Sequence, residues 1–176
     1  GCTVQRVFLQ EENDFTVTDD FVDAVTDDID AVFLCQPNNP TGQITPPELV
    51  QRLIRRCADC GAVLVVDECF LDFLQQRDAL TAKPFLQAAP NLIILKAFTK
   101  LYAMAGVRLG YALCANTALL AKMQAAGQPW GVSSLAQAAG AAALRETAYA
   151  DAVRALIADQ RPRLAAGLRA LGLQVI

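Results

Sequence analysis

The sequence contains no histidine among its 176 residues. This absence excludes Ser-His-Asp and Cys-His nucleophiles, and metal sites ligated by histidine, within this segment. No signal peptide is visible in this segment, and no apolar run is near the roughly 20 residues that span a bilayer. We therefore expect no membrane segment, and a cytoplasmic location is the default expectation.

An excess of positive charge is absent as well. The 15 Lys and Arg residues and 18 Asp and Glu residues give a formal net charge of -3. Such a chain presents no basic surface for nucleic acid, so we expect no nucleic-acid partner. A hydrophobic fraction of 54% beside 19% charged residues is typical of a globular protein with a real core.

Six cysteines are present, and Cys57 and Cys60 have the C-x-x-C spacing of zinc and redox sites. No second such pair occurs. Four of the six lie in apolar strand or helix patterns, where free cysteine packs as a small hydrophobe. The packing interpretation is favoured, and we predict no metal site.

Short β-branched runs alternate with helical patterns, which predicts an α/β fold with a mostly parallel sheet flanked by helices. The central three runs are apolar throughout, as expected for strands buried on both faces. The predicted strands are residues 4–9, 31–35, 62–66, 92–95 and 110–114.

The clearest helix signal is Thr45-Pro46-Pro47-Glu48, a capping box with proline at the first helical position. Apolar residues follow at helical spacing until Gly61. We expect Asn116 to cap a later helix and Pro162 to interrupt the last one. The other predicted helices are residues 21–29, 117–126, 134–146 and 149–171.

The composition changes to alanine-rich helix after Pro129-Trp130. We expect a domain boundary near residues 146–151. Residues 1–150 would then form part of a large domain, and residues 151–176 a helix leading into an incomplete second domain. The chain begins at Gly1 rather than Met, and a new strand is predicted to start at residues 174–176, so we expect a piece of a longer protein, truncated at both ends.

Polar segments follow the predicted strands. Asn39-Pro40-Thr41-Gly42 comes after the first apolar strand, Asp67 after the second and Thr99-Lys100 after the third, with Arg108 eight residues beyond the lysine. Ligands in α/β folds bind at the carboxyl ends of strands. The segments therefore supply an amide, a carboxylate, an amine and a guanidinium to one candidate site.

This set of groups is what pyridoxal phosphate chemistry requires. A lysine amine can condense with the cofactor aldehyde, and a carboxylate can hold the pyridine nitrogen protonated so that the ring withdraws electrons. An amide suits the phenolic oxygen, and an arginine fork suits the phosphate. The sequence therefore predicts pyridoxal 5'-phosphate as cofactor.

Each motif also has a purely structural interpretation. Asn39-Pro40-Thr41-Gly42 alone is a turn. Asp67 by itself is compatible with a carboxylate that pairs with a surface arginine. Arg108 by itself is compatible with an ordinary surface arginine. Glu68 is interpreted as a supporting or structural residue. It is the combination of the motifs that favours a functional site.

Three segments, residues 36–42, 65–73 and 99–111, resemble the signatures of class I/II aminotransferases, the fold-type I pyridoxal phosphate enzymes. The resemblance runs over nearly the whole chain. It is strongest to the branch of histidinol-phosphate aminotransferase and threonine-phosphate decarboxylase. It implies the large domain of the PLP-dependent transferase fold, a homodimer, and a small-molecule amino-acid substrate that is phosphorylated.

The resemblance also implies roles for individual residues. Lys100 and Asp67 would be catalytic, the lysine binding the cofactor aldehyde and the aspartate the ring nitrogen. Asn39 would bond the 3'-oxygen of the cofactor, and Thr99 and Arg108 its phosphate. The offset to Arg108 identifies Lys100 rather than Lys96, and we interpret Lys96 as a solvated lysine at a strand end.

Two positions depart from the family pattern. Ala97 stands where a hydroxyl residue usually bonds the phosphate, and Phe70 stands where many aminotransferases of this branch carry tyrosine. Phe70 favours threonine-phosphate decarboxylase, an enzyme of cobalamin side-chain biosynthesis. Histidinol-phosphate aminotransferase, a related aminotransferase and a non-catalytic fragment remain alternatives. The family's remaining phosphate cradle would precede Gly1, and its substrate arginine would follow Ile176.

Overall fold

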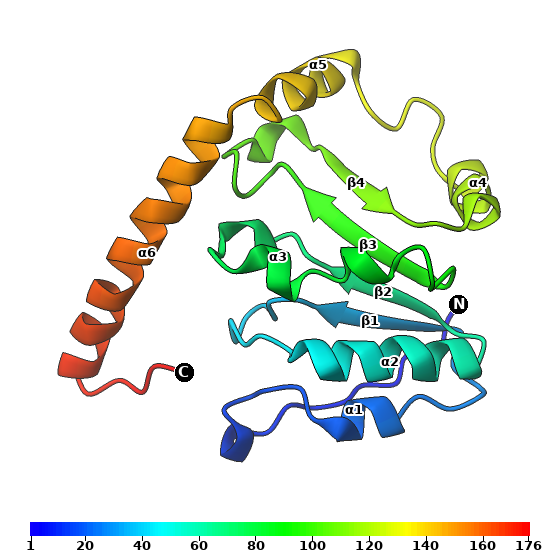
Figure 1. The fold of residues 1–176 in the computed structure, drawn as a ribbon, viewed down its shortest axis with the longest axis horizontal. Helices are drawn as coiled ribbons and strands as arrows, with labels where there is room; N and C mark the ends of the chain where they lie inside the picture. The colour runs from blue at the N-terminus through cyan, green and yellow to red at the C-terminus, as the bar shows by residue number, and fades with distance from the viewer.

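The computed structural model describes residues 1–176. A four-stranded sheet with the order β1-β2-β3-β4 forms its centre, as Figure 1 shows. The first three strands are parallel, and the last is antiparallel to its neighbour. The predicted mostly parallel α/β fold is therefore confirmed. The strands are β1 (Ala31–Cys35), β2 (Val63–Asp67), β3 (Leu92–Ala97) and β4 (Gly110–Leu113).

One face of the sheet carries the core. Helix α2 (Pro47–Asp59) lies beside β1, and the short helix α1 (Asp19–Asp23) lies beyond it (Figure 1). Leu53 of α2 is fully buried, and burial of such a side chain stabilises the fold by about 1.5–3 kcal/mol. The core consists of Val25, Val32, Leu34, Val50, Leu53, Ile54, Cys57, Ala62, Leu64, Val66, Ala82, Ala89, Leu92 and Ile94.

Helix α2 begins as predicted with a proline at its first position, Pro47, but the predicted capping box does not form. Pro46 is the N-cap residue, and no side chain caps the helix. Thr45 lies one residue before the N-cap, so its side chain does not cap the helical N–H groups. The side chain is buried, and its hydroxyl has no hydrogen-bond partner. Proline at the first position compensates, because it has no N–H to satisfy.

Three longer helices follow the sheet. Asn116 caps the first as predicted, accepting a hydrogen bond at 3.0 Å from the N–H of Leu119. Ser133 caps the second in the same way, through the N–H of Ala136 at 3.1 Å. These helices are α4 (Thr117–Ala126), α5 (Ser134–Ala143) and α6 (Thr147–Ala170). The short elements are η1 (Glu11–Asn13), η2 (Leu71–Phe73), α3 (Arg77–Leu80), η3 (Lys83–Phe85) and η4 (Ala105–Val107).

The strands predicted near the two ends of the chain do not form. Residues 4–9 form no strand, and Val4 and Phe8 are 67% and 75% exposed. A β-branched run needs a neighbouring strand to pair with, and these residues have none. Residues 174–176 likewise contain no strand.

Two helix predictions also needed correction. Residues 21–29 are helical only as far as Asp23, because the following Thr26 hydroxyl bonds the side chain of Asp28 and favours a turn. Pro162 does not interrupt α6, which is continuous through it. Proline frees the carbonyl of Ala158, and that residue is exposed, so water can satisfy the oxygen. No helix is both long enough and apolar enough to cross a bilayer.

Candidate functional site

The predicted site residues gather at one edge of the sheet. Strands β1, β2 and β3 are parallel, so their carboxyl ends meet there, and Cys35 pairs with Asp67 in the sheet register. Asn39 follows β1, and Lys100 lies in the turn that follows β3. Parallel pairing of distant segments thus places the amide, carboxylate and amine at the same edge.

Arg108 reaches this edge from the opposite direction. Strand β4 runs antiparallel to β3, and its first residue, Gly110, pairs with the last residue of β3, Ala97. Arg108 lies just before that pair. A Cβ atom on Gly110 would lie 2.9 Å from the carbonyl oxygen of Lys96, so this close approach of the two strands requires glycine.

The turn after β1 is held by a buried glutamine. The Gln36 side-chain amide donates to the carbonyl of Thr45 at 2.8 Å and accepts from its N–H at 2.8 Å. Gln36 is almost fully buried. Because both ends of the amide are paired with backbone, its rotamer is fixed, and the turn between Gln36 and Thr45 is closed.

Within that turn the two asparagines differ. Asn38 donates a side-chain hydrogen bond to the Thr41 hydroxyl at 2.8 Å, and its carbonyl accepts from the N–H of Gly42 at 2.7 Å. Gly42 has φ of 73°, which favours glycine. Asn39 is exposed, and its side-chain amide makes no hydrogen bond within the protein. Asn38 thus builds the turn and leaves the Asn39 amide available for a ligand.

Asp67 ends β2 as a half-buried carboxylate without a cationic partner. Its Oδ1 accepts from the N–H of Cys69 at 2.9 Å. Burial, a hydrogen bond to Asp67 and the charge of Asp67 raise the pKa of the Cys69 thiol to about 12. Burial and the same charge raise the pKa of the Cys35 thiol. Two protonated thiols therefore flank a carboxylate that remains available to a positively charged ring nitrogen.

Lys100 is exposed, and no carboxylate lies within ion-pair distance of its amine. Its Nζ lies 5.4 Å from the centroid of the Phe70 ring, a distance typical of cation–π contact. Phe70 follows Asp67 by three residues, so this contact links the amine to the segment that carries the carboxylate. Thr99 lies half-buried beside Lys100.

Arg108 is also an exposed cation without an acidic partner. Its Nη1 donates to the carbonyl of Ala105 at 3.2 Å, and its φ of 55° lies in the left-handed region. The remaining guanidinium N–H groups are free for an anion. Ala97 supplies no hydroxyl at this edge, which leaves Thr99 and Arg108 as the side chains suited to a phosphate.

The prediction that Lys96 is a solvated lysine at a strand end is wrong, because only 3% of the residue is exposed. Its Nζ donates to Asp72 Oδ1 at 2.9 Å and lies 3.0 Å from Glu68 Oε2. Burial lowers the pKa of this amine, but the hydrogen bond to Asp72 and the charge of Glu68 outweigh burial, so the pKa is raised. The sequence signal for this buried lysine was the pair of acidic residues Glu68 and Asp72, which follow β2 four positions apart.

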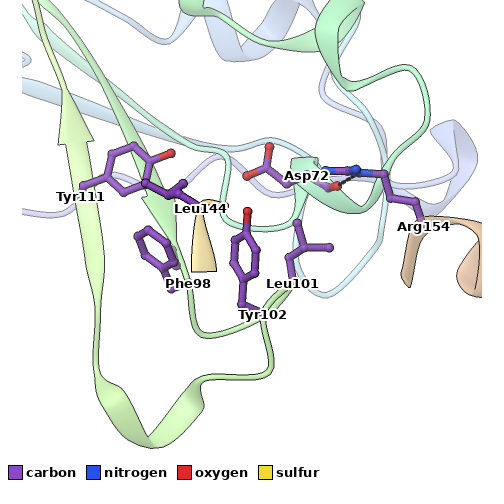
Figure 2. A pocket seen from close by; sticks show the side chains of 8 residues that line it. Asp72, Phe98, Leu101, Tyr102, Tyr111, Leu144 and Arg154 are labelled. Atoms are coloured by element: carbon purple, nitrogen blue, oxygen red, sulfur yellow. Dashed lines mark hydrogen bonds between the residues drawn. The ribbon is translucent and has the colours of Figure 1, made fainter. Parts of the chain in front are cut away.

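A small cavity of about 150 Å³ lies next to this edge (Figure 2). Phe98 is central to its wall, with ring centroids 5.5 Å from Tyr102 and 5.8 Å from Tyr111. Burial and the charge of Asp72 raise the pKa of Tyr111. No predicted site residue lines the cavity, and sequence analysis missed it. Its lining residues are Asp72, Ala97, Phe98, Leu101, Tyr102, Tyr111, Leu144 and Arg154.

A family model described as aminotransferase class I and II matches residues 1–176. The chain belongs to this family. The family's enzymes depend on pyridoxal phosphate, so the resemblance noted in the sequence is confirmed.

Individual relatives perform different reactions. The chain is 38% identical over 152 residues to threonine-phosphate decarboxylase of Salmonella typhimurium, covering 86% of this chain and 41% of that protein. It is 37% identical over 146 residues to histidinol-phosphate aminotransferase of Anaeromyxobacter sp., covering 82% and 39%. It thus spans about two fifths of the length of these relatives.

A solved structure has a similar fold. The histidinol-phosphate aminotransferase of Clostridium acetobutylicum superposes with a TM-score of 0.76 at 28% identity. The match covers 81% of this chain and 42% of that one.

The side chains at the sheet edge fit pyridoxal phosphate by their chemistry. Asp67 has no cationic partner, and Lys100 and Arg108 have no acidic one. Three unpaired charges at one edge match the ring nitrogen, the aldehyde and the phosphate of the cofactor.

Proposed function

We propose that the complete gene product is a pyridoxal 5'-phosphate enzyme that acts on a phosphorylated amino acid, with a reaction like that of threonine-phosphate decarboxylase. The observation that carries this proposal is the set of three unpaired charged groups, Asp67, Lys100 and Arg108, at the carboxyl edge of the sheet. Such an edge is where α/β folds bind ligands.

Each residue would have one task. Lys100 would bind the cofactor aldehyde through its amine and, once substrate replaces it, move protons as a base. Asp67 would hold the proton on the ring nitrogen. The Asn39 amide would bond the 3'-oxygen, and Arg108 and Thr99 would bind the phosphate. When bound, the cofactor supplies a ring that withdraws electrons from the substrate carbon.

Two observations favour decarboxylation over transamination. Phe70 lies against Lys100 and carries no phenolic hydroxyl. The threonine-phosphate decarboxylase relative is 38% identical over 86% of the chain. The second candidate is histidinol-phosphate aminotransferase, which is supported by relatives of 34–37% identity.

We further propose a cytoplasmic homodimer. Trp130, in the loop before α5, is 98% exposed, and Leu135, at the start of α5, is 82% exposed. Exposed large apolar side chains at one place mark an interaction site, and a second copy is the partner that the family suggests. Light scattering on the complete gene product tests the dimer, and a monomer at micromolar concentration would contradict it.

We also propose that residues 1–150 belong to the large domain and residues 151–176 to a helix leading into a second domain.

The proposed activity is tested in two steps. Titration of the complete gene product with pyridoxal phosphate should produce an absorbance band in the near-visible region, and Lys100→Ala should lack it. Incubation with O-phosphothreonine should then release carbon dioxide, whereas histidinol phosphate with 2-oxoglutarate should yield no glutamate. Glutamate without carbon dioxide would establish the aminotransferase instead, and the absence of a cofactor band would overturn the proposal.

A further inference from the structure

Lys96 and Glu68 are fully buried charges that the proposed chemistry does not use. They lie at the ends of β3 and β2, and their Nζ and Oε2 atoms are 3.0 Å apart. Apolar residues of similar volume often stabilise a fold as well as a buried ion pair does, so stability alone explains the pair poorly. A buried pair with directional bonds does fix the position of what it holds.

The Glu68 carboxylate is held from a second side. It accepts from the Thr81 hydroxyl at 2.8 Å and from the N–H of Ala82 at 2.7 Å. The backbone N–H of Glu68 also donates to the carbonyl of Leu95 at 3.0 Å, which extends the β2–β3 ladder by one bond. The residue directly after Asp67 is therefore immobilised through both backbone and side chain.

Asp72 is the second acidic partner of Lys96, and it too has another anchor. Arg154 of α6 donates from Nε to the backbone carbonyl of Asp72 at 2.8 Å, the dashed bond in Figure 2. Arg154 is itself held by Asp151 at 2.7 Å. Two cations from different elements thus fix one residue, Lys96 through the carboxylate and Arg154 through the main chain.

The fixed residues are next to both groups that the proposed site takes from the segment after β2. Glu68 follows Asp67 directly, and Asp72 lies two residues after Phe70. We infer that Lys96 and Arg154 are positioning residues, which hold the segment Asp67–Phe73 so that the Asp67 carboxylate and the Phe70 ring keep their places relative to Lys100. This inference rests on the proposed function.

The chain offers a matched control for Arg154. Arg56 of α2 donates from Nε to the backbone carbonyl of Val25 at 2.7 Å, the same type of bond at a place remote from the strand ends. Arg154→Met and Arg56→Met therefore each remove one Nε bond to a backbone carbonyl, one beside the proposed site and one away from it. Arg154→Met also removes the ion pair with the exposed Asp151. Lys96→Met removes the central cation, and Lys96→Arg keeps a cation there.

The experiment measures two quantities in the complete gene product: the dissociation constant of pyridoxal phosphate and the circular dichroism of its bound band. We expect Arg154→Met and Lys96→Met to weaken cofactor binding by about 10- to 100-fold, because small displacements of positioning groups have effects of this size. Both should lower the circular dichroism per bound cofactor, which reports the orientation of the ring. Lys96→Arg should restore both quantities, and Arg56→Met should change only thermal stability.

Three results would count against the inference. If Lys96→Met and Arg154→Met bind the cofactor as tightly as wild type with unchanged circular dichroism, the positioning role is overturned and the proposed function stands. An equal effect of Arg56→Met would show general destabilisation and also overturn it. If wild type shows no cofactor band, the proposed function and the inference fall together. Should Lys96→Met fail to fold, Arg154→Met decides.

Discussion

At the scale of the residue, Asp67 is a carboxylate whose neighbours are a backbone N–H and two protonated thiols. No cation lies within ion-pair distance of its oxygens. A half-buried carboxylate in that condition favours a ligand that brings its own proton or charge.

We predict that Asp67→Asn retains cofactor binding but slows turnover by about 100-fold or more, the effect of losing one preorganised electrostatic group. The amide keeps the size and the bond to Cys69 but cannot hold the ring nitrogen protonated. Steady-state rates and a cofactor titration check this. Full activity in Asp67→Asn would show that the carboxylate is structural.

Lys96 and Lys100 show where sequence reasoning succeeds and fails at this scale. Both follow the same apolar run, and Lys100 lies in the turn after the strand, as its sequence position predicts. Its role as the lysine that binds the cofactor stays a prediction. The burial of Lys96 depends on Asp72, which is 24 residues away, and on Glu68. A partner that distant becomes visible only when the register of β2 on β3 is known.

At the scale of the element, the turn after β1 depends on the Gln36 side chain. We predict that Gln36→Leu destabilises the protein, because it leaves the N–H and the carbonyl of Thr45 without partners, each costing about 1–3 kcal/mol. Cofactor binding should weaken as well, since the turn carries Asn39. Urea unfolding measures the first effect. Unchanged stability in Gln36→Leu would mean that water replaces the amide.

Most elements were predictable because their signals are local. The helical spacing of α2 and the Asn116 cap of α4 act within a few residues. The apolar strands β1 to β3 were found for the same reason. The strand predicted over residues 4–9 does not form, because a strand needs a neighbouring strand to pair with. The aromatic cavity was missed because its lining residues come from five separate places in the chain, between Asp72 and Arg154.

At the scale of the whole molecule, several groups that are wholly or partly buried bind their protons more tightly than usual. The pKa of the Cys57 thiol is raised from 9.0 to about 11, chiefly by burial, and that of Cys69 to about 12. The pKa values of Lys96 and Tyr111 are raised as well. Between pH 9 and pH 12 the folded state therefore holds more protons than the unfolded state.

We predict that the free energy of unfolding falls as the pH rises from 9 toward 12, and that Cys57→Ala makes this fall less steep. The slope against pH is compared, because the substitution also creates a cavity. Cys2→Ala is the control, since that thiol is exposed. Denaturant unfolding at several alkaline pH values gives the slopes. Stability that stays constant or rises over this range would contradict the prediction.

The central claim is that the amine of Lys100 binds the cofactor at the sheet edge. The most direct measurement is borohydride reduction of the complete gene product with pyridoxal phosphate, followed by proteolysis and mass spectrometry of the peptides. We predict the pyridoxyl mass on Lys100, whose amine is exposed and lies over the Phe70 ring. Its appearance on Lys96, or on no lysine, would contradict the account.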